Sequence, residues 1–538
     1  MKFNRMLALV LAVLTALSVA GGAMADEGQR EKIVIGLELS TNVEDYDTNE
    51  YTKFLEEQMN VDIEFFLFQD MKQKLPVMIS SNSDLPDIIL GTQEDAAMVN
   101  WTSQGVFQPL TEYWNNPEMT KHFDQRLAEL GETEALKKHI LSSITMPDGE
   151  IYSLPLYDEN VWNMREYRLW LNTDWLEALK LEVPTTLDEF ADVLRHFAND
   201  DPNGNGQKDE IPLIGSTAWG CDPSVYLLNS FIHANPDVNY INVENGKVVP
   251  AYTQDAFKAG LEYLNGLYNE GLIYPLSFTQ DGTQMKAAVN DDTVLCGSVV
   301  AGSTSNFTSE ARMAQYTIIP PLVGPEGVHY AASKEASVKG LAYITRSAKN
   351  PELCFRLLEN NYDFVWRMNF RYGIEGKNWT SDPETLSQYI GDFESLGYMP
   401  TYVVLDSVWG KVQNITWNAE IMPYLLPQTA VMMGGAKKAR TAENAGYVSA
   451  NATHYKGYAD CAPAEMIGTL IHTEEENEVL AAIQPTITEY VKEMVMAFIT
   501  GNASFDQWDS FQNELKVMGL EDYVTVLQAA YDRKVGSN

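Results

Sequence analysis

The stretch "KIVIGLELSTNVEDYDTNEYTKFLEEQMNVDIEFFLF", residues 32–68, decides the class of fold. It begins with a β-rich apolar run at 32–39, continues through a helical pattern, and ends with a second apolar run at 61–68. After an amphipathic stretch, a third apolar run closes "DLPDIIL" at residues 84–90. The alternation of strand, helix, strand, helix and strand predicts an α/β domain with parallel neighbouring strands.

Polar residues stand where these predicted strands end. Open α/β sheets bind their ligands beyond the carboxyl ends of the strands. We therefore expect side chains at these ends to offer hydrogen bonds to a ligand. The candidates are Thr41 after the first strand, Thr92 and Gln93 after the third, and Asp158 and Glu159 after "IYSLPLY".

A second unit begins at "YRLWLNTDWLEALKL", residues 167–181. Its clearest helix is "PTTLDEFADVLRHF" (184–197), in which Thr186 and Glu189 form a capping box and apolar residues recur at helical spacing. The C-terminal third is predicted to be mostly helical, with a kink at Pro485. The length of 538 residues favours more than one domain.

The first 25 residues are typical of an export signal. Lys2 and Arg5 precede an apolar run at 6–20, and Ala23-Met24-Ala25 has the small-x-small pattern of a signal-peptidase site. The run is shorter than the roughly 20 residues that a membrane-spanning helix needs. We expect cleavage before Asp26, and no lipid attachment, because no cysteine follows the run.

The composition is strongly acidic. The chain has 37 Lys and Arg against 75 Asp and Glu, a net charge of −38, and residues 1–25 carry two positive and no negative charges, so the mature chain would have −40. This charge disfavours nucleic acid and anionic lipid as partners. The four cysteines form no C-x-x-C pair. An exported location permits disulfides between them, but four buried thiols agree with the spacing at least as well.

Familiar catalytic motifs are missing from the sequence. It contains no G-x-x-x-x-G-K-[ST], no G-x-G-x-x-G after a strand, no H-E-x-x-H and no G-x-S-x-G. A glycosidase needs only two carboxylates and none of these motifs, so their absence does not exclude an exported glycoside hydrolase.

The loop "NDDPNGNGQKDEIP" (199–212) has the oxygen spacing of a calcium site. Calcium takes roughly six to eight oxygen ligands, and the EF-hand loop supplies them at alternate positions around a sharp bend that needs glycine. Position twelve, where the EF-hand has a glutamate, is Pro212, so Glu210 would close the loop earlier. An Asx-rich turn without an ion is the alternative. The candidate ligands are Asp201, Asn203, Asn205, the main-chain carbonyl of Gln207, Asp209 and Glu210.

Aromatic residues are abundant, with 11 Trp, 27 Tyr and 20 Phe. Aromatic faces can stack on sugar rings, although core packing is the usual role of a tryptophan. Four tryptophans stand past predicted strands or helices or in turn-rich sequence, where a ligand could reach them. They are Trp162, Trp219, Trp366 and Trp409.

Together these segments resemble the extracellular solute-binding proteins of ABC importers, family 1, especially the long members that bind oligosaccharides. The markers are "DLPDII", "GVFQPLTEYW", "GEIYSLP", the run "LWLNTDWL…DEIPL" (169–213) and the C-terminal "FITGNASFDQWDSFQNELKVMGLEDYVTVLQAAYDR". The resemblance covers nearly the whole mature chain. It implies that the loop ligands given above hold a structural calcium ion.

The resemblance also implies a two-lobed periplasmic-binding-protein fold of type II, with the ligand held between the lobes. Each lobe would be discontinuous in sequence, and crossing strands would join the two. We expect lobe 1 at 26–157 and again at 330–370, and lobe 2 at 158–329 with a helical remainder at 371–538.

The expected function is the capture of a carbohydrate, first of all an oligosaccharide, by hinge closure. The protein would then deliver the carbohydrate to the transmembrane subunits of a permease. The expected protein is a monomer without enzymatic activity, located in the periplasm, at the cell surface or in the medium. The rival hypotheses are the exported glycoside hydrolase and a sensor subunit that presents its ligand to a receptor. Gram-positive relatives usually carry a lipid-attachment cysteine after the signal, and this sequence departs from them there.

Overall fold

The computed structural model describes residues 30–537 apart from several gaps. The gaps are 94, 130–133, 159–160, 303–305, 386–401, 407, 409–411, 418–421, 427–456 and 459. The expected export signal, Glu159 and Trp409 therefore lie outside the described residues.

Lobe 1 is built on a six-stranded sheet with the order β14-β4-β11-β3-β1-β2. β1 pairs in parallel with β2 and β3, as the opening stretch predicted, whereas β11 lies antiparallel to both β3 and β4. The strands are β1 (Glu31–Glu38), β2 (Val61–Phe68), β3 (Ile88–Leu90), β4 (Ser153–Asp158), β11 (Ser337–Ile344) and β14 (Tyr424–Leu426).

Helices cover this sheet because each buries one apolar face against it. In α2, for example, Asn49 caps the first turn by accepting from the backbone N–H of Tyr51, and Tyr51 and Leu55 are buried. The lobe 1 helices are α2 (Glu50–Met59), α3 (Met71–Ser80), α4 (Asp95–Ser103), α5 (Thr111–Trp114), α6 (Lys121–Glu129), α7 (Glu134–Ser142), α15 (Pro351–Glu359) and α16 (Phe364–Tyr372).

Lobe 2 has a four-stranded sheet with the order β10-β5-β9-β6 and a β7-β8 hairpin. The predicted capping box of α10 is present, with Thr186 and Glu189 bonding each other's backbone N–H. The strands are β5 (Leu169–Asn172), β6 (Ile211–Ile214), β7 (Ile241–Glu244), β8 (Lys247–Pro250), β9 (Cys296–Val300) and β10 (Tyr316–Ile319), and the helices are α9 (Thr173–Leu179), α10 (Leu187–Asn199), α11 (Pro223–Leu228), α12 (Asp255–Asn269), α13 (Gly282–Val289) and α14 (Glu310–Ala314).

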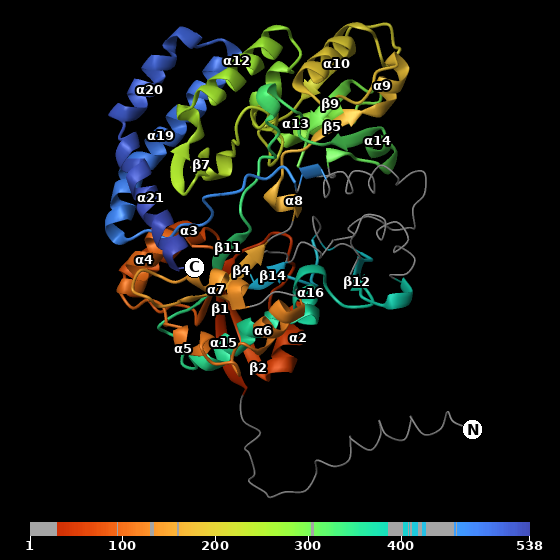
Figure 1. The fold of residues 1–538 in the computed structure, drawn as a ribbon. Helices are drawn as coiled ribbons and strands as arrows, with labels where there is room; N and C mark the ends of the chain where they lie inside the picture. Colours follow the sequence, from red (N-terminus) through yellow and green to blue (C-terminus); the bar gives the residue numbers. More distant parts are fainter. Residues whose placement is uncertain are drawn as a thin grey trace, which may run out of the picture.

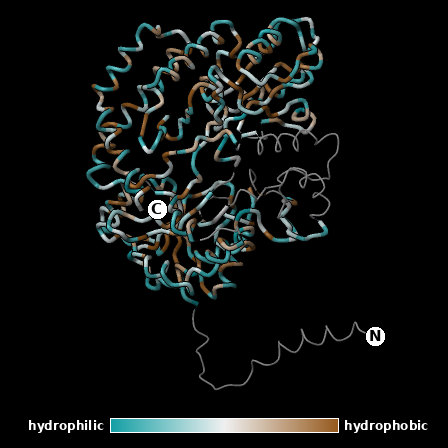
Figure 2. Tube along the Cα trace, viewed as in Figure 1, coloured by the Kyte–Doolittle hydropathy of each residue, from teal (hydrophilic) through white to brown (hydrophobic). Residues whose placement is uncertain are grey.

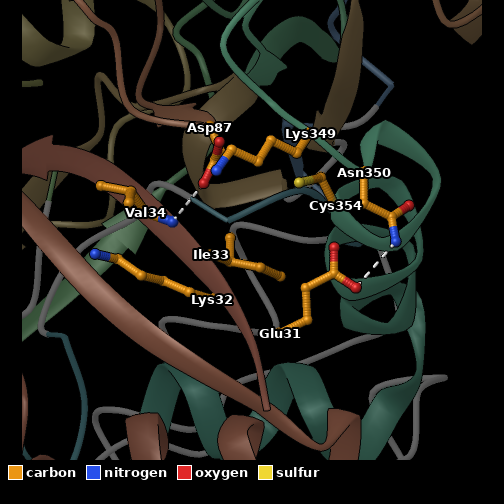
Figure 3. Close-up of a pocket in the computed structure, with 8 residues that line it drawn as sticks. All are labelled: Glu31, Lys32, Ile33, Val34, Asp87, Lys349, Asn350 and Cys354. Carbon is orange, nitrogen blue, oxygen red and sulfur yellow. Dashed lines mark hydrogen bonds between the residues drawn. The ribbon is translucent and has the colours of Figure 1, made fainter. Parts of the chain in front are cut away.

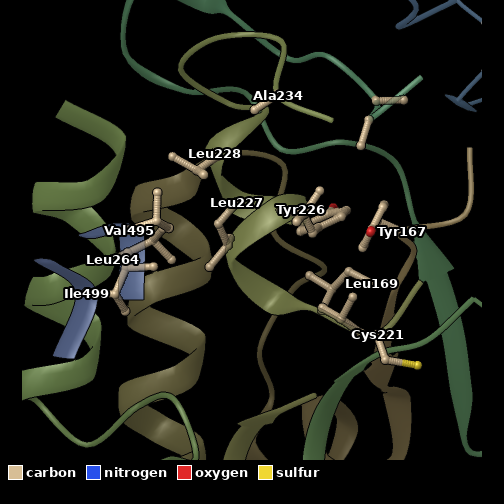
Figure 4. Packing of buried hydrophobic residues seen from close by; sticks show 14 of the residues in the cluster. Tyr167, Leu169, Cys221, Tyr226, Leu227, Leu228, Ala234, Leu264, Val495 and Ile499 are labelled. Atoms are coloured by element: carbon tan, nitrogen blue, oxygen red, sulfur yellow. The ribbon is translucent and has the colours of Figure 1, made fainter. Parts of the chain in front are cut away.

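Three C-terminal helices, α19 (Glu474–Thr500), α20 (Trp508–Val517) and α21 (Leu520–Ser537), extend the core of lobe 2. Val495 and Ile499 of α19 pack beside Leu264 of α12 and Leu228 of α11 (Figure 4). α19 continues through Pro485 as one helix. Hydrophobic segments gather inside each lobe (Figure 2). Within the described ranges, none of the helices combines the length and the apolarity needed to span a bilayer.

The two lobes lie one above the other and are joined by crossing segments (Figure 1). The first runs from β4 to β5 through α8 (Val161–Met164), and the second from β10 to β11. The backbone N–H of Lys334 donates to Met164 (3.1 Å), and that of Ala331 to Cys461 (2.8 Å), so segments far apart in sequence are bonded here.

The chain returns to lobe 2 later than the sequence predicted. β14 pairs in parallel with β4, with Tyr424 opposite Leu156, and Trp417 is buried in the lobe 1 core. The assignment of the whole range 371–538 to lobe 2 is therefore wrong for these residues. The reason is physical: a three-residue edge strand is too short to show a periodic pattern, and only its pairing reveals it.

The four cysteines are free thiols. Cys221, Cys296 and Cys354 are buried and Cys461 is half-buried. Burial raises the pKa of the Cys296 thiol to about 12, which keeps this thiol protonated and unreactive at neutral pH.

Candidate functional site: the pocket between the lobes

A pocket of about 610 Å³ lies between the lobes, beside the crossing segments. This volume is in the usual range for small-molecule sites. Neither lobe completes the pocket alone. Lobe 1 contributes Thr92, Leu156, Asp158, Ser337, Lys339 and Leu341, and lobe 2 contributes Asp237 and Val238. The two crossing segments contribute Asn163, Lys334, Glu335 and Ala336, and the segment before α19 contributes Gly468 and Thr469.

Two of the predicted strand-end residues, Thr92 and Asp158, line this pocket together. They meet because β3 and β4 flank β11, whose first residue, Ser337, pairs with Asp158. Thr92 is exposed, and the Asp158 carboxylate accepts from the amide of Asn163 at 2.6 Å. Polar residues at the carboxyl ends of β3 and β4 therefore line the same pocket, as expected for an α/β sheet.

A second pocket of about 480 Å³ adjoins the first and shares Thr92, Lys339 and Thr469 with it. Gln93, another predicted site residue, is in its wall. The side-chain amide of Gln93 donates to the carbonyl of Gly91 at 3.0 Å. The shared residues make the two pockets neighbours along β11.

The other predicted residues lie elsewhere. Thr41 is exposed past β1 and lines neither pocket. Trp366 packs edge-on against Phe54 of α2, with ring centroids 5.1 Å apart, so its ring is committed to the lobe 1 core. Trp162 is in α8, in the first crossing segment.

Trp219 stands out because its side chain is half exposed, at 50%. Every other tryptophan whose side chain the structure describes is buried or partly buried. Trp219 follows β6, and the next residue, Gly220, has φ +65° and comes so close to Gly302 and the carbonyl of Glu166 that a Cβ would lie 2.7 Å from either. The glycines therefore hold the loop of Trp219 against the start of β5 and the end of β9.

A network of ion pairs beside the pocket has no signal in the sequence. Lys334 bonds the carboxylates of Glu166 (2.7 Å) and Asp237. Lys534, near the end of the chain, bonds Glu335 at 2.6 Å. These residues are scattered among many charged residues of an acidic chain, and only the crossing of the segments brings them together.

The buried member of this network is Glu166, whose side chain is 2% exposed. Burial raises the pKa of Glu166, and this outweighs the opposite effect of Lys334. Burial lowers the pKa of Lys334, but its bonds to Asp237 and Glu166 outweigh this and leave the pKa raised. The network therefore joins the second crossing segment to lobe 2.

The loop at 201–210 connects α10 to β6 and folds around its own polar side chains. The Asp201 carboxylate accepts from the backbone N–H of Asn205 (3.1 Å) and Gly206 (3.0 Å). The Asp209 carboxylate accepts from the side-chain amides of Asn203 and Asn205. Gly206 has φ +72°, the conformation for which glycine is suited.

Glu210 supplies the test of whether an ion fits this loop. Its Oε1 is buried and has no hydrogen-bond partner. A buried carboxylate oxygen without a partner is costly, so this atom is suited to be the ligand of a cation. Among the described residues, no three His, Cys, Asp or Glu side chains converge as a metal site, so the loop would rely on amide and carbonyl oxygens as well, which suits a hard cation.

Lobe 1 has a further pocket, of about 390 Å³, whose lining residues are drawn in Figure 3. Asp87 accepts from the backbone N–H of Val34 at 2.8 Å there, and burial raises the pKa of this carboxyl. The pocket lies between the start of β1 and the start of α15, with no residue of lobe 2 among those that line it. It is separate from the site between the lobes.

The fold and the inter-lobe site define the class of protein. Residues 41–360 match the family of bacterial extracellular solute-binding proteins, and the chain belongs to this family. This confirms the resemblance carried by the sequence motifs.

Individual relatives are similar to this chain over most of its length. It is 26% identical over 505 residues to the fructooligosaccharide ABC transporter substrate-binding protein FusA of Streptococcus pneumoniae, covering 89% of this chain and 86% of FusA. The structure of FusA with kestose aligns at a TM-score of 0.73 and 23% identity, covering 94% of this chain and all (100%) of FusA. An EF-hand mutant of FusA with fructo-nystose aligns at 0.72 and 22% identity, with the same coverage.

A third solved structure, an HMO-binding, ABC-transporter-associated solute-binding protein from Bifidobacterium longum infantis, aligns at a TM-score of 0.74 and 20% identity. The alignment covers 94% of this chain and 99% of that one. These likenesses confirm the two-lobed α/β fold.

Proposed function

We propose that this protein is the extracytoplasmic substrate-binding protein of an ABC importer, and that it captures a carbohydrate in the pocket between its lobes. The observation that carries the proposal is a pocket with walls from both lobes. A ligand that touches both walls stabilises the closed arrangement over the open one, which is how hinge proteins capture their ligands. The closed form would then deliver the sugar to the transmembrane subunits of a permease.

The chemistry of the pocket suits a ligand rich in hydroxyl groups. Thr92, Ser337 and Thr469 offer hydroxyls, and Asp158 offers a carboxylate. Trp219 would stack on a sugar ring, with Trp162 as a second aromatic candidate. The names of two relatives, for fructooligosaccharide and HMO ligands, support an oligosaccharide. Thr41, Gln93, Glu159 and Trp409 remain candidate contacts.

The loop at 201–210 would hold a structural calcium ion. Asp201, Asn203, Asn205, Asp209 and Glu210 would contribute side-chain oxygens, and Gln207 its carbonyl. The unpaired oxygen of Glu210 supports this assignment. The ion would supply charge compensation and would fix the connection between α10 and β6.

The protein would act as a monomer outside the cytoplasm and would bind its sugar without converting it. Isothermal titration of the mature chain against a panel of neutral and acidic oligosaccharides tests this. We expect heat from at least one sugar, and no turnover of chromogenic glycosides. Heat from peptides with silence across all sugars, or turnover abolished by a single Asp or Glu substitution, would overturn the proposal.

A further inference from the structure

We propose, on the basis of the function proposed above, that the inter-lobe pocket selects uncharged sugars, and that Lys339 determines specificity as a hydrogen-bond donor to sugar hydroxyls. The inference comes from the distribution of charge around the pocket and from the position of one lysine. It goes beyond the class of ligand, because acidic polysaccharides are also made of sugar rings.

The lining of the 610 Å³ pocket carries one negative charge in excess, from the carboxylates of Asp158, Asp237 and Glu335 and the ammonium groups of Lys334 and Lys339. Glu166 and Lys534, which form ion pairs with the lining residues Lys334 and Glu335, carry charges that cancel. Lys334 is committed to Glu166 and Asp237, and Glu335 to Lys534. The network therefore leaves no surplus cation for an anionic ligand.

Lys339 is the exception among these charges. It is exposed on β11, and its side-chain ammonium makes no hydrogen bond or ion pair with any residue that the structure describes. It lines both pockets, so this residue lies where the two pockets adjoin. An ammonium has three donors and no acceptor, which suits the oxygens of sugar hydroxyls.

The position of Lys339 on the sheet limits its value as a counter-charge. It pairs with Leu156 of β4, and Asp158 lies two residues further along that strand. Diagonal neighbours of this kind are roughly 7–8 Å apart, close enough for the carboxylate to offset the ammonium. Among the described lining residues of both pockets there is also no arginine, the side chain that usually binds carboxylates in a bidentate way.

The test uses a matched pair of ligands: an oligosaccharide that binds, and the same oligosaccharide with one hydroxymethyl group oxidised to a carboxylate. By titration at low ionic strength, we expect the acidic form to bind at least about tenfold more weakly. The difference should shrink as salt is added, because it comes from Coulomb repulsion. Equal or tighter binding of the acidic form at low salt would overturn this inference and leave the proposed function intact. Silence from every sugar would instead refute the proposed function.

Two substitutions test the role of Lys339. Lys339→Met removes the N–H donors and should lower the affinity for the neutral sugar by about tenfold. Lys339→Gln keeps an N–H donor and should recover most of the lost affinity. Lys516→Met, at an exposed position on α20, is the control and should leave the affinity unchanged. If Lys339→Met leaves the affinity for the neutral sugar unchanged, Lys339 is not the donor proposed here. The same holds if Lys339→Gln and Lys339→Met lower this affinity equally.

Discussion

The loop at 201–210 and the pocket between the lobes are built in opposite ways. The loop draws its polar groups from ten consecutive residues, and its bonds run between residues two to six positions apart. The pocket draws on residues from Thr92 to Thr469, which come together only when the crossing segments lie side by side. A local site can be recognised from spacing, whereas a site assembled from distant segments depends on the packing of the whole molecule.

The largest expected effect tests the local site. Calcium at about 1,000 times its dissociation constant would stabilise the fold by about 4 kcal/mol, so a chelator should lower the melting temperature markedly. The double variant Asp201→Ala with Asn203→Ala should lose this response. Lys208→Gln, inside the same loop but outside the proposed ligand set, should keep it. A chelator response that is the same in the double variant and in the wild type would show that the loop is a turn without an ion.

The second effect tests the network that joins the crossing segments. Lys334→Met would leave the buried carboxylate of Glu166 without its cation, and we expect a loss of about 3 kcal/mol in unfolding free energy, measured with urea. Adding Glu166→Gln should restore part of the loss, because the buried charge is removed as well. Lys377→Met, whose partner Glu50 is also exposed, should cost no more than about 1 kcal/mol. Equal losses for the two lysines would show that the network carries no special stability.

The third effect concerns binding more than stability. Trp219→Ala should weaken sugar affinity by about tenfold in titration if this exposed ring, which is not among the residues that line the two pockets, stacks on the sugar as proposed. The free energy of unfolding should change little, since the side chain is half exposed. Leu276→Ala, in lobe 2 with a similar exposure of 49%, is the matched control for loss of apolar surface. Unchanged affinity in Trp219→Ala would remove this residue from the site.

The smallest effect is the pH dependence of one contact in lobe 1. The Nδ1 of His122 lies 2.8 Å from the Glu359 carboxylate, and this bond raises the pKa of His122 above its usual value near 6.5. The stabilisation is therefore complete below about pH 6.5 and disappears as the pH rises through the higher folded pKa. Urea unfolding of His122→Asn should show a smaller difference from the wild type at pH 8.5 than at pH 5.5. A constant difference would contradict the assignment.

Much of the fold could be predicted from the sequence, because periodicity and capping are local properties. The β1-α2-β2 unit and the capping box of α10 are in the structure where the patterns predicted them. β14 escaped prediction because three residues at a sheet edge carry no period. Trp366 and Trp219 look alike in sequence, and only packing shows that the first contacts Phe54 while the second faces solvent.

The sequence by itself determined the α/β class, the family and the loop with its oxygen spacing, because each of these depends on residues close together in the chain. The tertiary structure alone decided which strand ends share a pocket, that Lys334 joins Glu166 to Asp237, and that Lys339 is left without a partner among the described residues. The physical reason is that a charge acquires its role from what lies within a few ångströms of it. In this chain those neighbours are often more than 100 residues away.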